Sequence, residues 1–260
     1  MLHLLKIEWL KVKNYRTFWI LSALFIISIF GINYIVLQVQ QEVKKTEFGQ
    51  LLGGPFDFPQ VWHSVAYVSS FLLFIPGLLM IISITNEFSY KTHRQNIIDG
   101  LSRQQFISVK MMLAVIIAFV STTVVFIMAF LFGKLSGGTA INFDRISYIG
   151  MFFIQTLSYS MLALLFGLLF RRSGIAIGVF FLYMLIIDEL IAGVLKRYIG
   201  QIGYYMPLES NDVLIPLPFG KQIISRYFTR PDTMYLLIAV ALYLLAYFIF
   251  NRRKFATTDL

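Results

Sequence analysis

Long apolar runs alternate with short polar segments along most of the chain. A helix rises about 1.5 Å per residue, so about 20 predominantly apolar residues cross the hydrocarbon core of a bilayer. Six runs reach or approach this length, which predicts membrane-spanning helices over residues 17–37, 62–84, 111–132, 146–170, 174–195 and 234–250. The last run is short unless it continues past its ends. The pattern predicts an all-α integral membrane protein with a single transmembrane domain over residues 1–260.

The segment before the first run, residues 2–16, combines basic residues with an imperfect apolar stripe. Leu2, Leu5, Trp9 and Val12 fall on one side of a helix. Such a stripe, with lysines on the other sides, predicts an interfacial helix that lies on the membrane surface with Trp9 at headgroup level. A basic flank that only anchors the first span is the alternative.

The most polar stretch, residues 86–110, lies between the second and third apolar runs. Gly100 is placed to end a short helix over about residues 88–99, because glycine readily takes the left-handed conformation found after a helix. Ser102 and Gln105 match a capping box that starts the next helix. The stretch therefore predicts two short helical pieces at one membrane face, and a solvated turn is the alternative for the first of them.

Two predicted spans contain residues that break their apolar pattern. Pro76 in the second span predicts a kink, because proline removes a helical hydrogen bond. In the fourth span, Gln155, Ser158 and Tyr159 are at positions i, i+3 and i+4 and share one helix face. A polar face of this kind avoids lipid, so it packs against another helix or lines a water-accessible path.

The fifth span begins with small residues and ends near two acids. Gly174 and Gly178 form a GxxxG pattern, which permits close approach to a helix of this chain or of a second copy. Asp188 and Glu189 either serve a function within the membrane or mark the place where the helix meets water. The following segment, residues 196–233, is rich in Gly, Pro and aromatics and predicts external re-entrant or interfacial pieces.

Composition excludes a large soluble domain and several kinds of chemistry. Of the 260 residues, 58% are hydrophobic and 13% are charged, against about 45–50% and 25% in soluble domains. The absence of cysteine excludes disulfides and thiol nucleophiles. The sequence contains neither HExxH nor GxSxG, which argues against an intramembrane enzyme, and its three histidines are too scattered for a shared metal site. It has no phosphate-binding loop either, so any ATP is bound by another polypeptide.

Positive charge is concentrated on one predicted membrane face. The face that holds both termini carries 13 of the 22 basic residues and 4 of the 13 acidic ones, and the opposite face is left with nine of each. Basic residues favour the cytoplasmic side, so both termini are predicted to be cytoplasmic. The net charge of +9 could also indicate nucleic-acid binding. Because the charge is spread over short segments that flank spans, membrane orientation explains it and no nucleic-acid partner is predicted.

At the polar stretch the chain resembles the permease subunits of ABC-2-type ABC transporters. The likeness is carried by Glu87-Phe88, Thr92, Arg94, Gly100 to Arg103, Phe106 and Lys110. The arrangement of predicted elements is also similar: an N-terminal interfacial helix, six spans, a tight hairpin between the fourth and fifth, and a long external segment before the sixth. The resemblance implies a multi-pass protein of a bacterial plasma membrane.

The resemblance also implies a function. Two permease subunits, either two copies of this chain or this chain and a homologue, would form an export pathway. A separate cytosolic ATPase, which binds ATP and Mg, would dock on a coupling helix within residues 86–110. Coupling roles would then belong to Glu87, Phe88, Thr92, Arg94, Gly100 and Arg103. A pathway or outer gate would involve Gln155, Ser158, Tyr159, Asp188 and Glu189, and Gly174 and Gly178 would serve helix packing or dimerisation. The alternative is a membrane anchor or sensor that recruits a cytosolic partner without transport.

Overall fold

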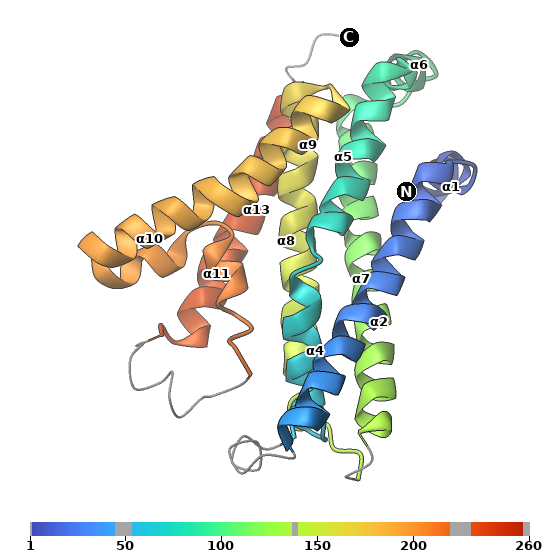
Figure 1. The fold of residues 1–260 in the computed structure, drawn as a ribbon. Coiled ribbons are helices and arrows are strands. Elements are labelled where there is room, and N and C mark those ends of the chain that lie inside the picture. The colour runs from blue at the N-terminus through green and yellow to red at the C-terminus, as the bar shows by residue number, and fades with distance from the viewer. Residues whose placement is uncertain (1, 45–53, 137–139, 219–229, 257–260) are drawn as a thin grey trace.

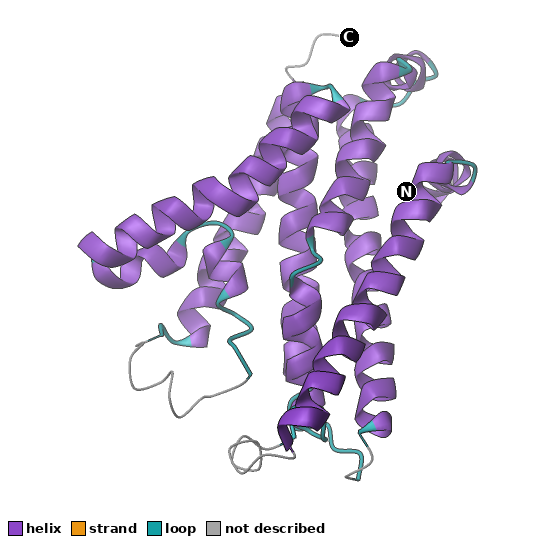
Figure 2. Ribbon diagram, viewed as in Figure 1, coloured by secondary structure: helices purple, strands orange, loops and turns teal. Residues whose placement is uncertain are grey.

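The computed structural model describes residues 2–44, 54–136, 140–218 and 230–256. These residues are helical or lie in loops, and they contain no strand (Figure 2). Five helices are long and apolar enough to cross a membrane, and a bent pair of helices supplies a sixth candidate span. The structure agrees with the predicted all-α membrane fold. Residues 219–229 of the predicted external segment lie outside the described residues.

Most of the membrane-length helices extend beyond the apolar runs that predicted them. The short sixth run is part of a 24-residue helix, about 36 Å long, which is enough to cross a bilayer. An N-terminal helix, α1 (Leu2–Lys13), precedes the first span, as predicted. The long unbroken helices are α2 (Arg16–Lys44), α7 (Arg103–Leu135), α8 (Ser147–Phe170) and α13 (Thr233–Ala256).

The second candidate span is broken rather than kinked at its proline. It consists of α4 (Gln60–Ser70) and α5 (Phe74–Ser89), which are bent by 48°. Pro76 has no N–H to donate to the carbonyl of Leu72, and its ring crowds that carbonyl. The helix therefore breaks one turn before Pro76, at the residues between α4 and α5, and not at Pro76 itself.

The centre of the bundle is α8, which packs against α4, α5, α7, α9 and α13. Two-thirds of the residues in its apolar 18-residue stretch are buried, whereas the buried share in the other unbroken candidate spans does not exceed one-third. Two glycines allow the close approach of α5 to its neighbours. A Cβ at Gly77 would lie 2.6 Å from the ring of Phe180, and a Cβ at Gly167 would overlap the side chain of Ile84.

The fifth candidate span slopes away from α8 (Figure 1). It consists of α9 (Ser173–Leu182), a π-helical turn (Tyr183–Ile187) and α10 (Asp188–Tyr198). The chain then turns back through a 3₁₀ helix (Gly200–Tyr205) to the short helix α11 (Glu209–Asp212), which contacts α8, α10 and α13. Figure 1 also places α1, the short helix α6 (Thr92–Ile98), the α8–α9 turn and the end of α13 toward one end of the bundle, called the α6 end below.

Candidate functional site

The polar stretch at the α6 end folds into a short helix with defined ends. Lys91 takes a left-handed conformation, with φ of 55°, and separates α5 from α6. At the other end Gly100 has φ of +99°, its N–H donates to the carbonyl of Ile97, and the next N–H donates to the carbonyl of Asn96. These two bonds form a Schellman motif, which confirms the predicted glycine terminator.

The predicted start of the next helix is also confirmed. The N–H of Gln105 donates to the hydroxyl of Ser102, and the N–H of Ser102 donates to the side chain of Gln105. The short helix itself differs from prediction. It begins at Thr92 rather than near residue 88, because α5 continues through Ser89 and the left-handed Lys91 prevents the two helices from joining.

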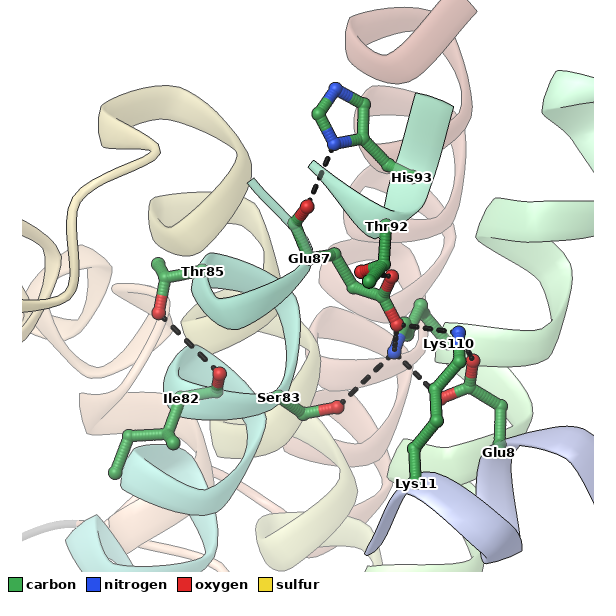
Figure 3. Close-up of polar contacts among 9 residues, drawn as sticks. All are labelled: Glu8, Lys11, Ile82, Ser83, Thr85, Glu87, Thr92, His93 and Lys110. Atoms are coloured by element: carbon green, nitrogen blue, oxygen red, sulfur yellow. Dashed lines mark hydrogen bonds and ion pairs between the residues drawn. The ribbon is translucent and has the colours of Figure 1, made fainter. Parts of the chain in front are cut away.

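Four charged side chains from three helices form a buried ion cluster beside α6 (Figure 3). The cluster contains Glu8 and Lys11 of α1, Glu87 of α5 and Lys110 of α7. The ammonium nitrogen of Lys110 lies 2.6 Å from a carboxylate oxygen of Glu8 and 2.9 Å from one of Glu87. The nitrogen of Lys11 lies 2.8 Å from Glu87 and 3.1 Å from Glu8. Two cations therefore face two anions, and the cluster is neutral.

Most of the cluster is excluded from water. The side chains of Lys110 and Glu87 are 2% and 4% exposed, whereas that of Lys11 is 32% exposed. Burial lowers the pKa of Lys11, but the carboxylates of Glu8 and Glu87 outweigh this effect and raise it above its ordinary value. Removal of one member of a buried ion pair costs about 3–5 kcal/mol, because the remaining charge stays buried. The cluster therefore fixes α1, α5 and α7 relative to one another.

Glu87 also attaches α6 to this cluster (Figure 3). The hydroxyl of Thr92, the first residue of α6, donates to the second carboxylate oxygen of Glu87. Nδ1 of His93 lies 2.8 Å from the backbone carbonyl of Glu87, and a carbonyl only accepts, so this nitrogen is the donor. The ring of His93 also packs against that of Phe88, with centroids 4.8 Å apart. The position of α6 thus depends on Glu87.

The residues predicted to serve coupling differ in their surroundings. Glu87 and Thr92 belong to the buried network, and Arg94 is exposed on α6. The ring of Phe88 lies 5.7 Å from the guanidinium carbon of Arg171, in the α8–α9 turn. Gly100 and Arg103 lie beyond α6, and the guanidinium of Arg103 donates to the carbonyl of Ala256 at the end of α13.

Sequence reasoning missed the roles of Glu8 and Lys11 in this site. A signal was present, because Glu8 is the only acidic residue among the first 41 and stands in an otherwise basic segment. Lys110 stands at the start of the apolar run of α7, where an unpaired charge would be costly. The sequence gives no indication that Glu8 and Lys110, which are 102 positions apart, are in contact.

The polar face of α8 packs on α11. The amide of Gln155 donates to the backbone carbonyl of Asn211, and the amide of Asn211 donates to the hydroxyl of Ser158. The hydroxyl of Tyr159 lies 2.9 Å from a carboxylate oxygen of Asp212. Burial raises the pKa of Asp212 to about 7, and the hydrogen bond from Tyr159 opposes this rise. These contacts are those of a face that packs against another helix, which is one of the two predicted alternatives; the other is a water-accessible path.

Asp188 and Glu189 have different environments. Asp188 is buried and accepts hydrogen bonds from the N–H groups of Leu208 and Glu209 at the start of α11, and from the hydroxyl of Tyr183. Glu189 is exposed. Asp188 therefore holds α11 against α10, whereas the exposed Glu189 does not share this role.

The GxxxG residues of α9 are not packed within the described part of the chain. Gly174 and Gly178 are exposed, and a Cβ at either would meet nothing within 4 Å. Ile175 and Leu182 of the same helix are each 49% exposed. Among the residues that the structure describes, the close-packed glycines are Gly77, Gly133, Gly167 and Gly203, which the sequence pattern does not identify.

No group of three or more His, Cys, Asp or Glu side chains that could hold a metal ion occurs among the residues that the structure describes. Residues 4–187 match a family model described as ABC-2 family transporter protein. The matched region runs from α1 to the π-helical turn and includes the whole ion cluster, α6 and α8. Comparison with curated proteins gave no match.

Proposed function

Because the chain belongs to the ABC-2 family of transporter proteins, we propose that it is the permease subunit of an exporter driven by a separate cytosolic ATPase. The chain is a multi-pass membrane component of a family that lacks ATPase activity, and its members typically pair with an ABC ATPase. The single observation that carries the proposal is the attachment of α6 to three other helices through the buried ion cluster.

We propose that α6 is the coupling helix and that the α6 end, with both termini, is cytoplasmic. The excess of basic residues at this end supports the orientation. Arg94 and Gln95 are exposed on α6, and Ile98 is 79% exposed although it is strongly apolar. These exposed side chains are accessible to a docked protein.

The ion cluster would transmit movement of α6 to the membrane helices. A displacement of α6 pulls on Glu87 through Thr92, and Glu87 is paired with Lys110 of α7 and Lys11 of α1. These buried charges separate only at a high energetic cost, so α1, α5 and α7 move with α6. The break between α4 and α5 would then act as the hinge, since it already bends the span by 48°.

The export pathway would form between two permease copies. The exposed face of α9, with Gly174 and Gly178, supports a helix contact with the second copy. The helix α11 is held against the middle of α8 by the polar face of that helix and against α10 by Asp188, which supports a role of residues 196–218 as part of an outer gate.

Co-expression with the partner ATPase tests the docking role of α6. Arg94→Glu combined with Ile98→Asp should abolish co-purification of the ATPase while the permease still folds, because both side chains are exposed. Lys134→Glu, an exposed charge at the opposite end of α7, is the matched control and should leave co-purification unchanged. Full retention of the ATPase by the α6 variant would refute docking at this helix.

An exporter and a passive membrane anchor differ in whether ATP changes the arrangement of the membrane spans. The chain has no cysteine, so a single Gly178→Cys substitution gives a unique crosslinking site between copies. An exporter should show a change of crosslinking yield on addition of ATP and Mg to the assembled complex. A constant yield, with the ATPase still bound, would favour a membrane anchor that recruits the partner without transport.

A further inference from the structure

A large cavity lies between α1 and the first half of α2 on one side and α5 and α7 on the other. Its volume is about 580 Å³, within the range of about 300–1,000 Å³ that is typical of ligand sites. Its walls are mostly apolar and include Val12, Phe18, Leu79, Leu113 and Ile117. An apolar cavity does not hold ordered water and can take up an apolar molecule.

The cavity is continuous with the lipid-facing surface of the bundle. Ile26 of α2 and Ile116 and Val120 of α7 line it, and these side chains are also 40–55% exposed within candidate spans. A second cavity of about 230 Å³ shares the lining residues Glu8, Val12, Phe18 and Leu79. Val12 and Phe18, on either side of the connection from α1 to α2, therefore border both cavities.

One end of the cavity is polar and aromatic. It is lined there by Lys6, Trp9 and Trp19. The two indole rings meet edge to face with centroids 6.2 Å apart, and the ring nitrogen of Trp19 donates to the carbonyl of Lys13. Tryptophan is enriched at the level of lipid headgroups, so this end lies at the membrane surface and the apolar end lies in the hydrocarbon.

Three cations without an acidic partner occur in the α1–α2 segment, and one of them, Lys6, lines this end of the cavity. Lys6, Lys13 and Arg16 are exposed and form no ion pair within the described part of the chain. The acid nearest in sequence, Glu8, is already engaged with Lys11 and Lys110 in the ion cluster. The polar end therefore carries positive charge, which suits a phosphate with a net negative headgroup.

We propose that the cavity binds an anionic glycerophospholipid from the surrounding bilayer. One acyl chain fills the apolar part between α2 and α7, and the phosphate lies beside Lys6 and the two tryptophans. The bound lipid fills the space under α1 and supports the helix that supplies Glu8 and Lys11 to the ion cluster. Nothing in this assignment depends on transport or on an ATPase.

Tryptophan fluorescence provides a direct test, because the chain contains only three tryptophans. Trp9 and Trp19 line the cavity, and Trp62 of α4 is fully buried elsewhere. The purified full chain is reconstituted in phosphatidylcholine vesicles, and phosphatidylglycerol with brominated acyl chains, which quenches indoles on contact, is titrated in. Brominated phosphatidylcholine is titrated in parallel.

The proposal expects quenching by brominated phosphatidylglycerol at a lower mole fraction than by the zwitterionic lipid. Lys6→Gln should raise the half-quenching mole fraction roughly fivefold, the usual effect of one cation near an anionic lipid surface. Lys134→Gln removes an exposed charge at the other end of α7 and should change nothing. A Trp9→Phe/Trp19→Phe variant should lose the selective quenching.

Two outcomes would overturn the proposal. The first is equal quenching by both brominated lipids, with no effect of Lys6→Gln, which would indicate ordinary boundary lipid. The second comes from Ser121→Phe, which places a ring inside the cavity from the wall of α7. This variant should reduce quenching by phosphatidylglycerol, and unchanged quenching in a folded Ser121→Phe protein would place the lipid elsewhere. Lys6→Gln changes an exposed side chain and so tests the site even if Ser121→Phe does not fold.

Discussion

Replacement of Lys110 by methionine removes one cation from the buried ion cluster and keeps a side chain of similar length. Glu8 and Glu87 then share only Lys11, so the cluster carries a net negative charge in a buried setting. The loss of one partner from a buried ion pair costs about 3–5 kcal/mol. For a chain of this size, each kcal/mol lowers the melting temperature by roughly 2–4 °C, so Lys110→Met should lower it by about 6–20 °C.

Thermal unfolding of the purified protein in detergent measures this change. The exposed Lys134→Met is the control and should shift stability by no more than about 0.5 kcal/mol. The double variant Lys110→Met/Glu8→Gln restores neutrality, with Glu87 still paired to Lys11. It should therefore be less destabilised than the sum of the single variants, with a coupling energy of about 0.5–3 kcal/mol.

Two results would contradict this reasoning. One is a Lys110→Met protein as stable as the Lys134→Met control, which would mean that the ion cluster does not hold the helices together. The other is strict additivity of the two single substitutions, which would mean that Lys110 and Glu8 do not interact. The proposed coupling role of α6 further predicts that Lys110→Met leaves an associated ATPase bound but weakens the response of the spans to ATP.

Four further substitutions test other parts of the structure. The pKa of Asp212 is raised to about 7, so this carboxyl holds its proton more tightly in the folded state than in the unfolded state. The free energy of unfolding should therefore fall as the pH rises from about 4 to 7. Melting curves recorded over this pH range should show the fall for the unchanged protein and not for Asp212→Asn. Gly77→Ala should cost about 1–3 kcal/mol through overpacking, while Gly178→Ala should leave monomer stability unchanged but weaken self-association measured by crosslinking. Thr92→Val should cost about 1.5–3 kcal/mol, because it removes a hydrogen bond to the Glu87 carboxylate, and circular-dichroism melts would show this loss.

The features that sequence predicted correctly are local or compositional. The candidate spans follow from apolar runs, because the bilayer imposes a length on each helix. The Schellman motif at Gly100 and the capping box from Ser102 to Gln105 each involve residues within a few positions of one another. Their geometry is determined by backbone preferences that do not depend on the rest of the fold.

The features that sequence did not predict depend on contacts between distant segments. Glu87 was expected to serve coupling, but its burial between Lys11 and Lys110 follows from the packing of three helices. Lys91 adopts φ of 55°, which is uncommon for a residue other than glycine, and this shortens α6 from its expected start. The roles of Gly77 and Gly167 follow from which helices lie opposite them, and their spacing in the chain gives no indication of this.

The composition of the ion cluster also constrains the order in which the protein is assembled. Glu8 and Lys11 are made first, but Lys110 is about 100 residues further along the chain, which corresponds to roughly 5–20 s of synthesis. Until α7 has emerged, α1 has no buried site in which its acid is neutralised, and it stays undocked. Docking of α1 therefore signals that the third span is in place. Ribosome-arrested chains that end before Lys110 should leave α1 accessible to protease, and chains that extend well past α7 should protect it.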